Sequence, residues 1–154
     1  MTLHALHQLL ASHGLAMRNV GSISDQSMAG IITTATHGSG LAFRVMSDDV
    51  LSLTMLMADG NIIRCSRDES PDLFMATLCG LGATGLILTV QLAVEKAFRL
   101  RDLGKTITFD EAIADFDLIV NSAEHVRLWW FPQVNRVRVS SASRTYQVSR
   151  DLFG

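Results

Sequence analysis

GSISDQSMAGIITTATHGSG, residues 21–40, is the most informative part of this chain. Thirteen of these twenty residues are Gly, Ala, Ser or Thr, and no Lys or Arg occurs between Arg18 and Arg44. Small side chains allow backbone N–H groups to approach a ligand closely, and such amides bind anions without a cationic side chain. The segment is therefore a candidate anion-binding loop.

The composition of residues 21–40 leaves a second interpretation open, that of a flexible Gly/Ser/Thr loop. Met28, Ile31 and Ile32 argue against a linker, because they are apolar residues at the spacing of one helix face. His37 lies between a hydroxyl residue and two nearby glycines, where its ring can donate a hydrogen bond or contact a ligand ring. From the residues alone, a binding loop and a flexible loop both remain open.

Upstream of this loop, residues 2–13 are expected to form a helix that ends at Gly14. Leu3, Leu6, Leu9 and Leu10 recur at three- and four-residue spacing. Because the helix begins almost at Met1, we expect its leucine stripe to lack a partner. Only 18% of the residues are charged, against about 25% in typical domains, and the mean hydropathy is +0.26. Both values also suggest a part of a larger protein.

Downstream, the pattern alternates between strands and helices. We expect a strand over residues 50–58, a two-residue hairpin turn at Asp59-Gly60, a second strand over 61–65, a helix beginning at Ser70-Pro71 and a buried strand over 85–94. Residues 80–85 match the GxGxxG pattern of dinucleotide-binding loops. That loop follows a strand and opens a helix, whereas here the order is reversed, so a simple turn is favoured.

The pattern of residues changes after Glu95, and we place a domain boundary there, between residues 1–95 and 96–154. An extended segment over 100–108 precedes a capping box, Thr108 to Glu111, and two strands follow over 125–131 and 136–146. The aromatic run Trp129-Trp130-Phe131 is interpreted first as a core strand and second as a wall facing a ligand.

Composition excludes several classes of protein. The formal net charge of −2 provides no polybasic surface for nucleic acid, and 48% hydrophobic residues exclude disorder. Cys65 and Cys79 form neither a disulfide framework nor a CxxC zinc motif, and His4 and His7 lack supporting ligands, so no metal site is expected. The sequence contains no apolar run of about 18 residues, so no membrane span is predicted.

With these residues described, the sequence resembles the aldonolactone oxidases, FAD flavoproteins of the vanillyl-alcohol oxidase type. The resemblance rests on ordered motifs: residues 21–40, Ala58-Asp59-Gly60, Leu81-Gly82-Ala83-Thr84-Gly85 with Ile87, and Arg127-Leu128-Trp129-Trp130-Phe131-Pro132. Members usually have glycine where this chain has Ala35.

The resemblance implies an α+β fold. Residues 1–95 are the second subdomain of a vanillyl-alcohol-oxidase-type (PCMH-type) FAD-binding domain, and residues 96–154 begin an α+β substrate (cap) domain. The residues it implies along the FAD are Ser24, Ala29, Gly30, Thr33, Thr34, Thr36, His37, Gly38 and the backbone near Ile87.

The resemblance also implies an activity for the parent enzyme. By this resemblance, the parent enzyme oxidises a sugar 1,4-lactone such as D-arabinono-1,4-lactone with O2 and releases H2O2. Relatives of this type are membrane-associated, some at mitochondria. The family's first phosphate loop and its late Glu/Arg residues have no match here, so no catalytic residue is assigned. We expect a truncated chain that is inactive alone. The alternatives are a non-catalytic flavin-binding module whose partner chain supplies the first FAD subdomain, and an α+β domain without ligand.

Overall fold

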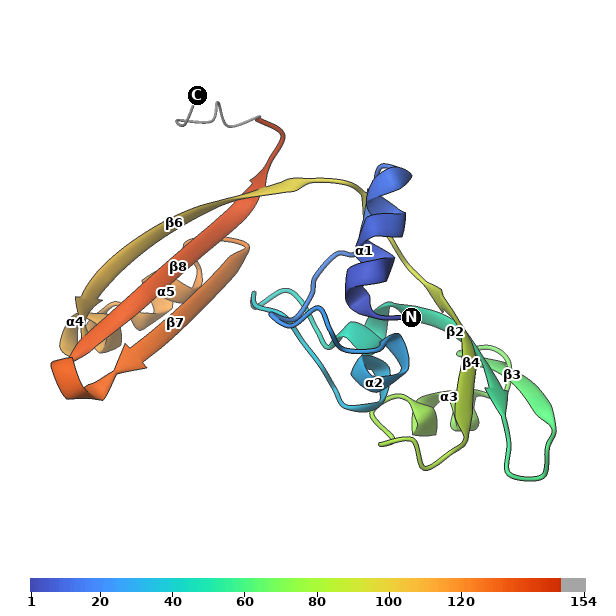
Figure 1. The fold of residues 1–154 in the computed structure, drawn as a ribbon. Coiled ribbons are helices and arrows are strands. Elements are labelled where there is room, and N and C mark those ends of the chain that lie inside the picture. The colour runs from blue at the N-terminus through green and yellow to red at the C-terminus, as the bar shows by residue number, and fades with distance from the viewer. Residues whose placement is uncertain (148–154) are drawn as a thin grey trace. The chain divides into compact units, whose positions relative to one another are not determined.

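The computed structural model describes residues 1–147, and Figure 1 shows their ribbon. The chain divides into two compact units. The first contains residues 1–38 and 44–97, and the second contains Ser39–Phe43 together with the chain from Phe98 onward. None of the described helices is long and apolar enough to cross a membrane.

The first unit is a small antiparallel sheet with helices packed around one core. Its elements are α1 (Leu3–Ser12), β1 (Leu15–Ala16), α2 (Met28–Thr33), the 3-10 helix η1 (Met46–Asp49), β2 (Val50–Leu56), β3 (Ile62–Ser66), α3 (Pro71–Thr77), β4 (Leu86–Leu92) and β5 (Glu95–Lys96). The main sheet has the order β3-β2-β4, and β1 pairs with β5. Helices and strands thus mix as expected for an α+β fold.

Helix α1 confirms the predicted helix but corrects the prediction that its leucine stripe lacks a partner. Leu3 is fully buried, and Leu6 and Leu10 pack on the core cluster that contains Ile31 and Ile32. The partner surface comes from downstream sequence, which the local pattern of the helix does not reveal. Only Leu9 of the stripe remains exposed.

The hairpin at Asp59-Gly60 is present, but its loop is one residue longer than predicted. Met57 N donates to Asn61 O at 2.8 Å and Gly60 N donates to Met57 O at 3.0 Å, which encloses residues 58–60. Gly60 has φ +84°, the left-handed conformation that a three-residue hairpin loop needs at this position. Strands β2 and β3 pair on either side of it.

Strand β4 was predicted to be buried, and this prediction is wrong. Leu86 and Leu88 are 62% and 45% exposed, because β4 lies at the edge of a sheet with one packed face. Ile87 and Val90 do pack against the core. Helix α3 matches its prediction, with Phe74 fully buried, although Ser70 does not cap it with its side chain.

The second unit is a three-stranded antiparallel sheet with two short helices. Its elements are β6 (Arg99–Thr108), α4 (Phe109–Ala114), α5 (Phe116–Val120), β7 (His125–Phe131), the 3-10 helix η2 (Pro132–Val134) and β8 (Arg136–Thr145), with strand order β6-β8-β7. Its core contains Ala112, Ile119, Val137 and Val139.

The aromatic run on β7 is not a core strand, contrary to the interpretation placed first. Trp129, Trp130 and Phe131 are 40%, 56% and 49% exposed. Side chains alternate between the faces of a strand, and Trp130 stacks on Phe109 of α4 with ring centroids 4.8 Å apart. Trp129 and Phe131 therefore lie on the face of the sheet opposite α4.

Ala35 has φ +53°, a left-handed backbone conformation that costs an L-residue about 1–2 kcal/mol. Replacing it with glycine relieves this strain but adds entropy to the unfolded chain. We expect Ala35→Gly to raise the free energy of unfolding by about 0.5–1 kcal/mol. The control Ala11→Gly, in regular helix α1, should instead lower it by about 0.5–1 kcal/mol. Urea unfolding measures the free energy of unfolding of both variants. If Ala35→Gly and Ala11→Gly lower it equally, Ala35 is not strained.

The capping box of α4 makes a second prediction. Thr108 N donates to Glu111 Oε2 at 2.7 Å, and this bond and that of the Thr108 hydroxyl hold the pKa of Glu111 below its ordinary value of 4.5. A carboxyl whose folded-state pKa is lowered stabilises the fold above its ordinary pKa, and loses this effect as pH falls through the folded value. Between pH 6 and 3, the unfolding temperature of Glu111→Gln should therefore change less with pH than that of the wild-type chain. Asp110→Asn, which leaves the box intact, should retain the wild-type slope; a Glu111→Gln slope equal to it would refute the prediction.

Candidate functional site

In the loop before α2, residues 22–26, two carbonyl groups bind helix α1, whereas the amides do not bind the described chain. The carbonyl oxygens of Ser24 and Gln26 accept hydrogen bonds at 2.9 Å from His4 N and Leu3 N. These two amides lie in the first turn of α1, where the helix itself provides no acceptor for them. The N–H groups of residues 22–26 donate no hydrogen bond within the described chain. Residues 22–25 are exposed. The loop is therefore anchored through its carbonyls while consecutive amides remain available to a ligand.

Helix α2 places two of the predicted residues, Ala29 and Gly30, in its first turn. Ser27 is the N-cap, and its hydroxyl oxygen accepts from Gly30 N at 3.0 Å. A Cβ at Gly30 would lie 3.0 Å from that oxygen, so a larger residue would require the cap hydroxyl to shift by a few tenths of an ångström. Because the helix has six residues and its N-terminus is already capped, the preceding loop is the better source of anion-binding amides.

The three predicted threonines have different surroundings. Thr33 is buried, and its hydroxyl donates back to Ala29 O at 3.0 Å, so its side chain belongs to the core. Thr34 donates to Gly30 O at 2.8 Å, and its Oγ1 lies 3.2 Å from Thr36 Oγ1. The structure thus brings the hydroxyls of Thr34 and Thr36 together, whereas the buried hydroxyl of Thr33 donates to the carbonyls of Ala29 and Gly30.

The end of the segment is held firmly, which contradicts the interpretation as a flexible loop. Met46 N donates to Thr36 O at 2.8 Å, and His37 forms a β-bridge with Val45. The exposed His37 ring donates from Nδ1 to Gly38 O at 2.8 Å, since a carbonyl only accepts. A Cβ at Gly38 would lie 2.1 Å from Asn19 Oδ1, so this position admits only glycine.

The turn at residues 79–85 joins the same region. Cys79 N donates to Ile32 O and Leu81 N to Thr33 O, each at 3.0 Å, so the turn satisfies the C-terminal carbonyls of α2. It connects α3 to β4, which confirms that the GxGxxG pattern is a turn between a helix and a strand. No local pattern in the residues indicates that this turn lies at the end of α2.

Backbone strain gathers where this turn meets α2. Cys79 and Leu81 have φ +60° and +54°, and Ala35, one residue beyond the C-cap of α2, is also left-handed. Residues in such conformations often lie at functional sites. Ile87, two residues past the turn, directs its side chain into the core and pairs with Met55. Only its backbone is left for a ligand.

The arginines that flank the segment in sequence are occupied by carboxylates. Arg18 pairs with Asp49 at 3.1 Å and Arg44 with Asp48 at 3.5 Å. Burial raises the pKa of Asp49, and the charge of Arg18 opposes this shift. These acids therefore serve ion pairs, and the donors of the loop are uncharged amides and hydroxyls.

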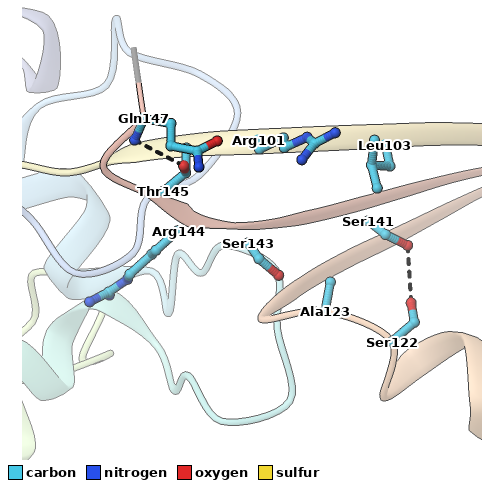
Figure 2. Close-up of a pocket in the computed structure, with 9 residues that line it drawn as sticks. All are labelled: Arg101, Leu103, Ser122, Ala123, Ser141, Ser143, Arg144, Thr145 and Gln147. Atoms are coloured by element: carbon cyan, nitrogen blue, oxygen red, sulfur yellow. Dashed lines mark hydrogen bonds between the residues drawn. The ribbon is translucent and has the colours of Figure 1, made fainter. Parts of the chain in front are cut away.

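A groove of about 330 Å³ in the second unit is a separate feature. Figure 2 shows Ser122 and Ser141 within it, their hydroxyl oxygens 3.1 Å apart, and Gln147 N donating to Thr145 Oγ1 at 3.1 Å. None of the predicted site residues lines this groove. The predicted residues gather instead in the first unit.

Comparison with known proteins assigns both parts of the chain. Residues 1–66 match the family model of the FAD binding domain, and residues 90–152 match that of D-arabinono-1,4-lactone oxidase. D-arabinono-1,4-lactone oxidase of Yarrowia lipolytica is 41% identical over 143 residues, which cover 93% of this chain and 27% of that protein. L-gulonolactone oxidase of Mus musculus is 34% identical over 134 residues, 87% of this chain and 30% of that protein. The chain thus spans less than a third of the length of these relatives.

Solved structures agree on the fold. A solvent-stable cholesterol oxidase superposes with a TM-score of 0.85 at 22% identity, over 96% of this chain and 31% of the other. Cholesterol oxidase from Brevibacterium sterolicum gives 0.84 at 18% identity, with the same coverage. This confirms the vanillyl-alcohol-oxidase-type FAD-binding fold, and with the family match it confirms FAD as the cofactor of this domain. The available amides of residues 22–26 fit the diphosphate of FAD. By sequence and fold, the chain is similar to the aldonolactone oxidases, a family of FAD flavoproteins.

Proposed function

We propose that this chain forms the second part of the FAD site of an aldonolactone oxidase. The observation that supports this most is the run of amides at residues 22–26, which make no hydrogen bond within residues 1–147 although their carbonyl neighbours are anchored. When bound, FAD supplies the redox chemistry, in which a lactone is oxidised and O2 is reduced to H2O2. The substrate class proposed is a sugar 1,4-lactone, as in the relatives' names.

The chain's own residues bind and orient the cofactor. The amides of residues 22–26 donate to the diphosphate, and each hydrogen bond to a charged group contributes about 1.5–3 kcal/mol. Ala29 and Gly30, in the first turn of α2, keep the backbone beside this loop free of bulk. Thr34, Thr36 and His37 provide polar side chains at the other end of α2, and Gly38 allows the chain to pass Asn19. The backbone near Ile87 completes the proposed contacts.

The proposed share of this chain is cofactor contact without turnover. It spans 27% of the Yarrowia lipolytica relative, and none of its described side chains is assigned a role in lactone chemistry. We infer that the chain by itself binds FAD weakly, in the micromolar range or above, and releases no H2O2 from D-arabinono-1,4-lactone. Substrate-binding residues would come from the segment after residue 96 together with parts that this chain does not contain.

Flavin fluorescence quenching tests the site. We expect the chain to bind FAD, and Ser24→Asp to weaken binding at least tenfold, because a carboxylate on the loop repels the diphosphate by more than about 1.4 kcal/mol. Ser70→Asp adds the same charge to an exposed serine between β3 and α3, and should change affinity less than twofold.

Four results would count against the proposal. Equal weakening by Ser24→Asp and Ser70→Asp would move the site away from the loop. An absence of quenching by the wild-type chain at high FAD concentration would favour a domain without ligand. Binding that appears only when a second polypeptide is added would favour the module that requires a partner chain, and lactone-dependent H2O2 would contradict the lack of turnover.

A further inference from the structure

Residues 39–43 connect the proposed cofactor loop to the second unit; we call them the strap. They follow Gly38 directly, yet they pack with the chain from Phe98 onward, whereas residues 21–38 belong to the first unit. The chain therefore passes between the units after residue 38, after residue 43 and after residue 97. The anchor of the strap lies 82 positions further along the sequence, at His125.

His125 makes two contacts with the strap. Its Nδ1 lies 3.0 Å from Ser39 O, and its ring stacks on Phe43 with centroids 4.7 Å apart and planes 4° from parallel. Because a carbonyl oxygen only accepts, Nδ1 must carry the proton and donate. The side chain is only 7% exposed, and Nε2 has no hydrogen-bond partner within the described residues. The strap is thus the group that satisfies the buried donor of this histidine.

The strap also fits closely against the start of β7. Gly40 has φ +104°, and a Cβ there would lie 2.2 Å from Glu124 O and 2.7 Å from Phe43 Cδ2. Phe43 N donates to Gly40 O at 3.2 Å, which closes the strap into a turn. Only glycine allows this approach, so the fit is specific to this backbone path.

The surface that receives the strap is itself fixed. Arg144 N donates to Glu124 Oε2 at 2.7 Å, which ties the start of β7 to β8 beside His125. His125 pairs with Ala142, and ten register pairs join β8 to β6 on its other side. The strap therefore rests on a paired sheet rather than on another loop.

We propose that His125 is a positioning residue that holds the strap, the backbone that continues the cofactor loop after Gly38. This rests on the function proposed above. Ordering each strap residue costs backbone conformational entropy, and without the anchor part of that cost is added to FAD binding. With the anchor, the strap that continues the loop is organised before the cofactor arrives, which raises affinity.

The test compares variants of His125 in the whole chain. His125→Leu retains an apolar side chain but removes the donor to Ser39 O, whereas Asn retains a donor near the position of Nδ1. We expect His125→Leu to speed amide hydrogen exchange of residues 38–43 at least tenfold and to weaken FAD binding about five- to tenfold. His125→Asn should stay within threefold of wild type in both.

Val139→Ala is the matched control for lost stability. Val139 is buried in the same unit, but it packs toward α4 and α5 on the opposite sheet face from His125. It should lower the unfolding temperature while exchange at residues 38–43 and FAD affinity stay within twofold of wild type. Equal effects of Val139→Ala and His125→Leu, or wild-type exchange in His125→Leu, would overturn the proposal.

The exchange measurement separates this inference from the proposed function. If the wild-type chain fails to bind FAD while exchange of residues 38–43 still depends on His125, the strap is supported and the cofactor site is refuted. If FAD binds but neither exchange nor affinity responds to His125→Leu, the site stands and the strap proposal fails.

Discussion

The first unit depends on how its short helix α2 is held at both ends. Ile31 and Ile32 are fully buried, which fixes the helix in the core. Before the helix, the carbonyls of Ser24 and Gln26 bind the amides at the start of α1; after it, the carbonyls of Ile32 and Thr33 receive the amides of the turn at residues 79–85. The carbonyls of Ser24 and Gln26 are bound within the chain, whereas the amides of residues 22–26 donate no hydrogen bond among the described residues. The geometry of the candidate site follows from this division.

A site made of neutral donors suits a diphosphate in this setting. Arg18 and Arg44 flank the segment but form ion pairs with Asp49 and Asp48. Amide dipoles bind an anion without the desolvation cost of burying a cationic side chain. The small residues of the loop serve the same end, since close approach of the backbone requires little side-chain bulk. Ala35 adopts a left-handed conformation that glycine would hold with less strain, so this turn keeps its backbone path at some cost.

Local patterns predicted the local structure well. The capping box at Thr108, the helix after Ser70-Pro71 and the turn at residues 80–85 all have short-range causes, and each was found. Features that depend on distant residues were missed. The leucine stripe of α1 packs on a core cluster formed by several downstream elements, and the aromatic run on β7 is exposed although its composition favoured a core strand. The small-residue segment was recognised as a candidate site, but neither its contact with residues 79–81 nor the anchoring of the strap by His125 follows from spacing in the sequence.

The most direct test of the central claim is a titration of the ¹⁵N-labelled chain with FAD, followed residue by residue through its amide chemical shifts. The account predicts that the largest shift changes occur at residues 22–26, with smaller changes near Thr34 to Gly38 and almost none in β6 to β8. Unchanged signals at residues 22–26, in a sample where FAD shifts other amides, would show that these donors do not bind the diphosphate.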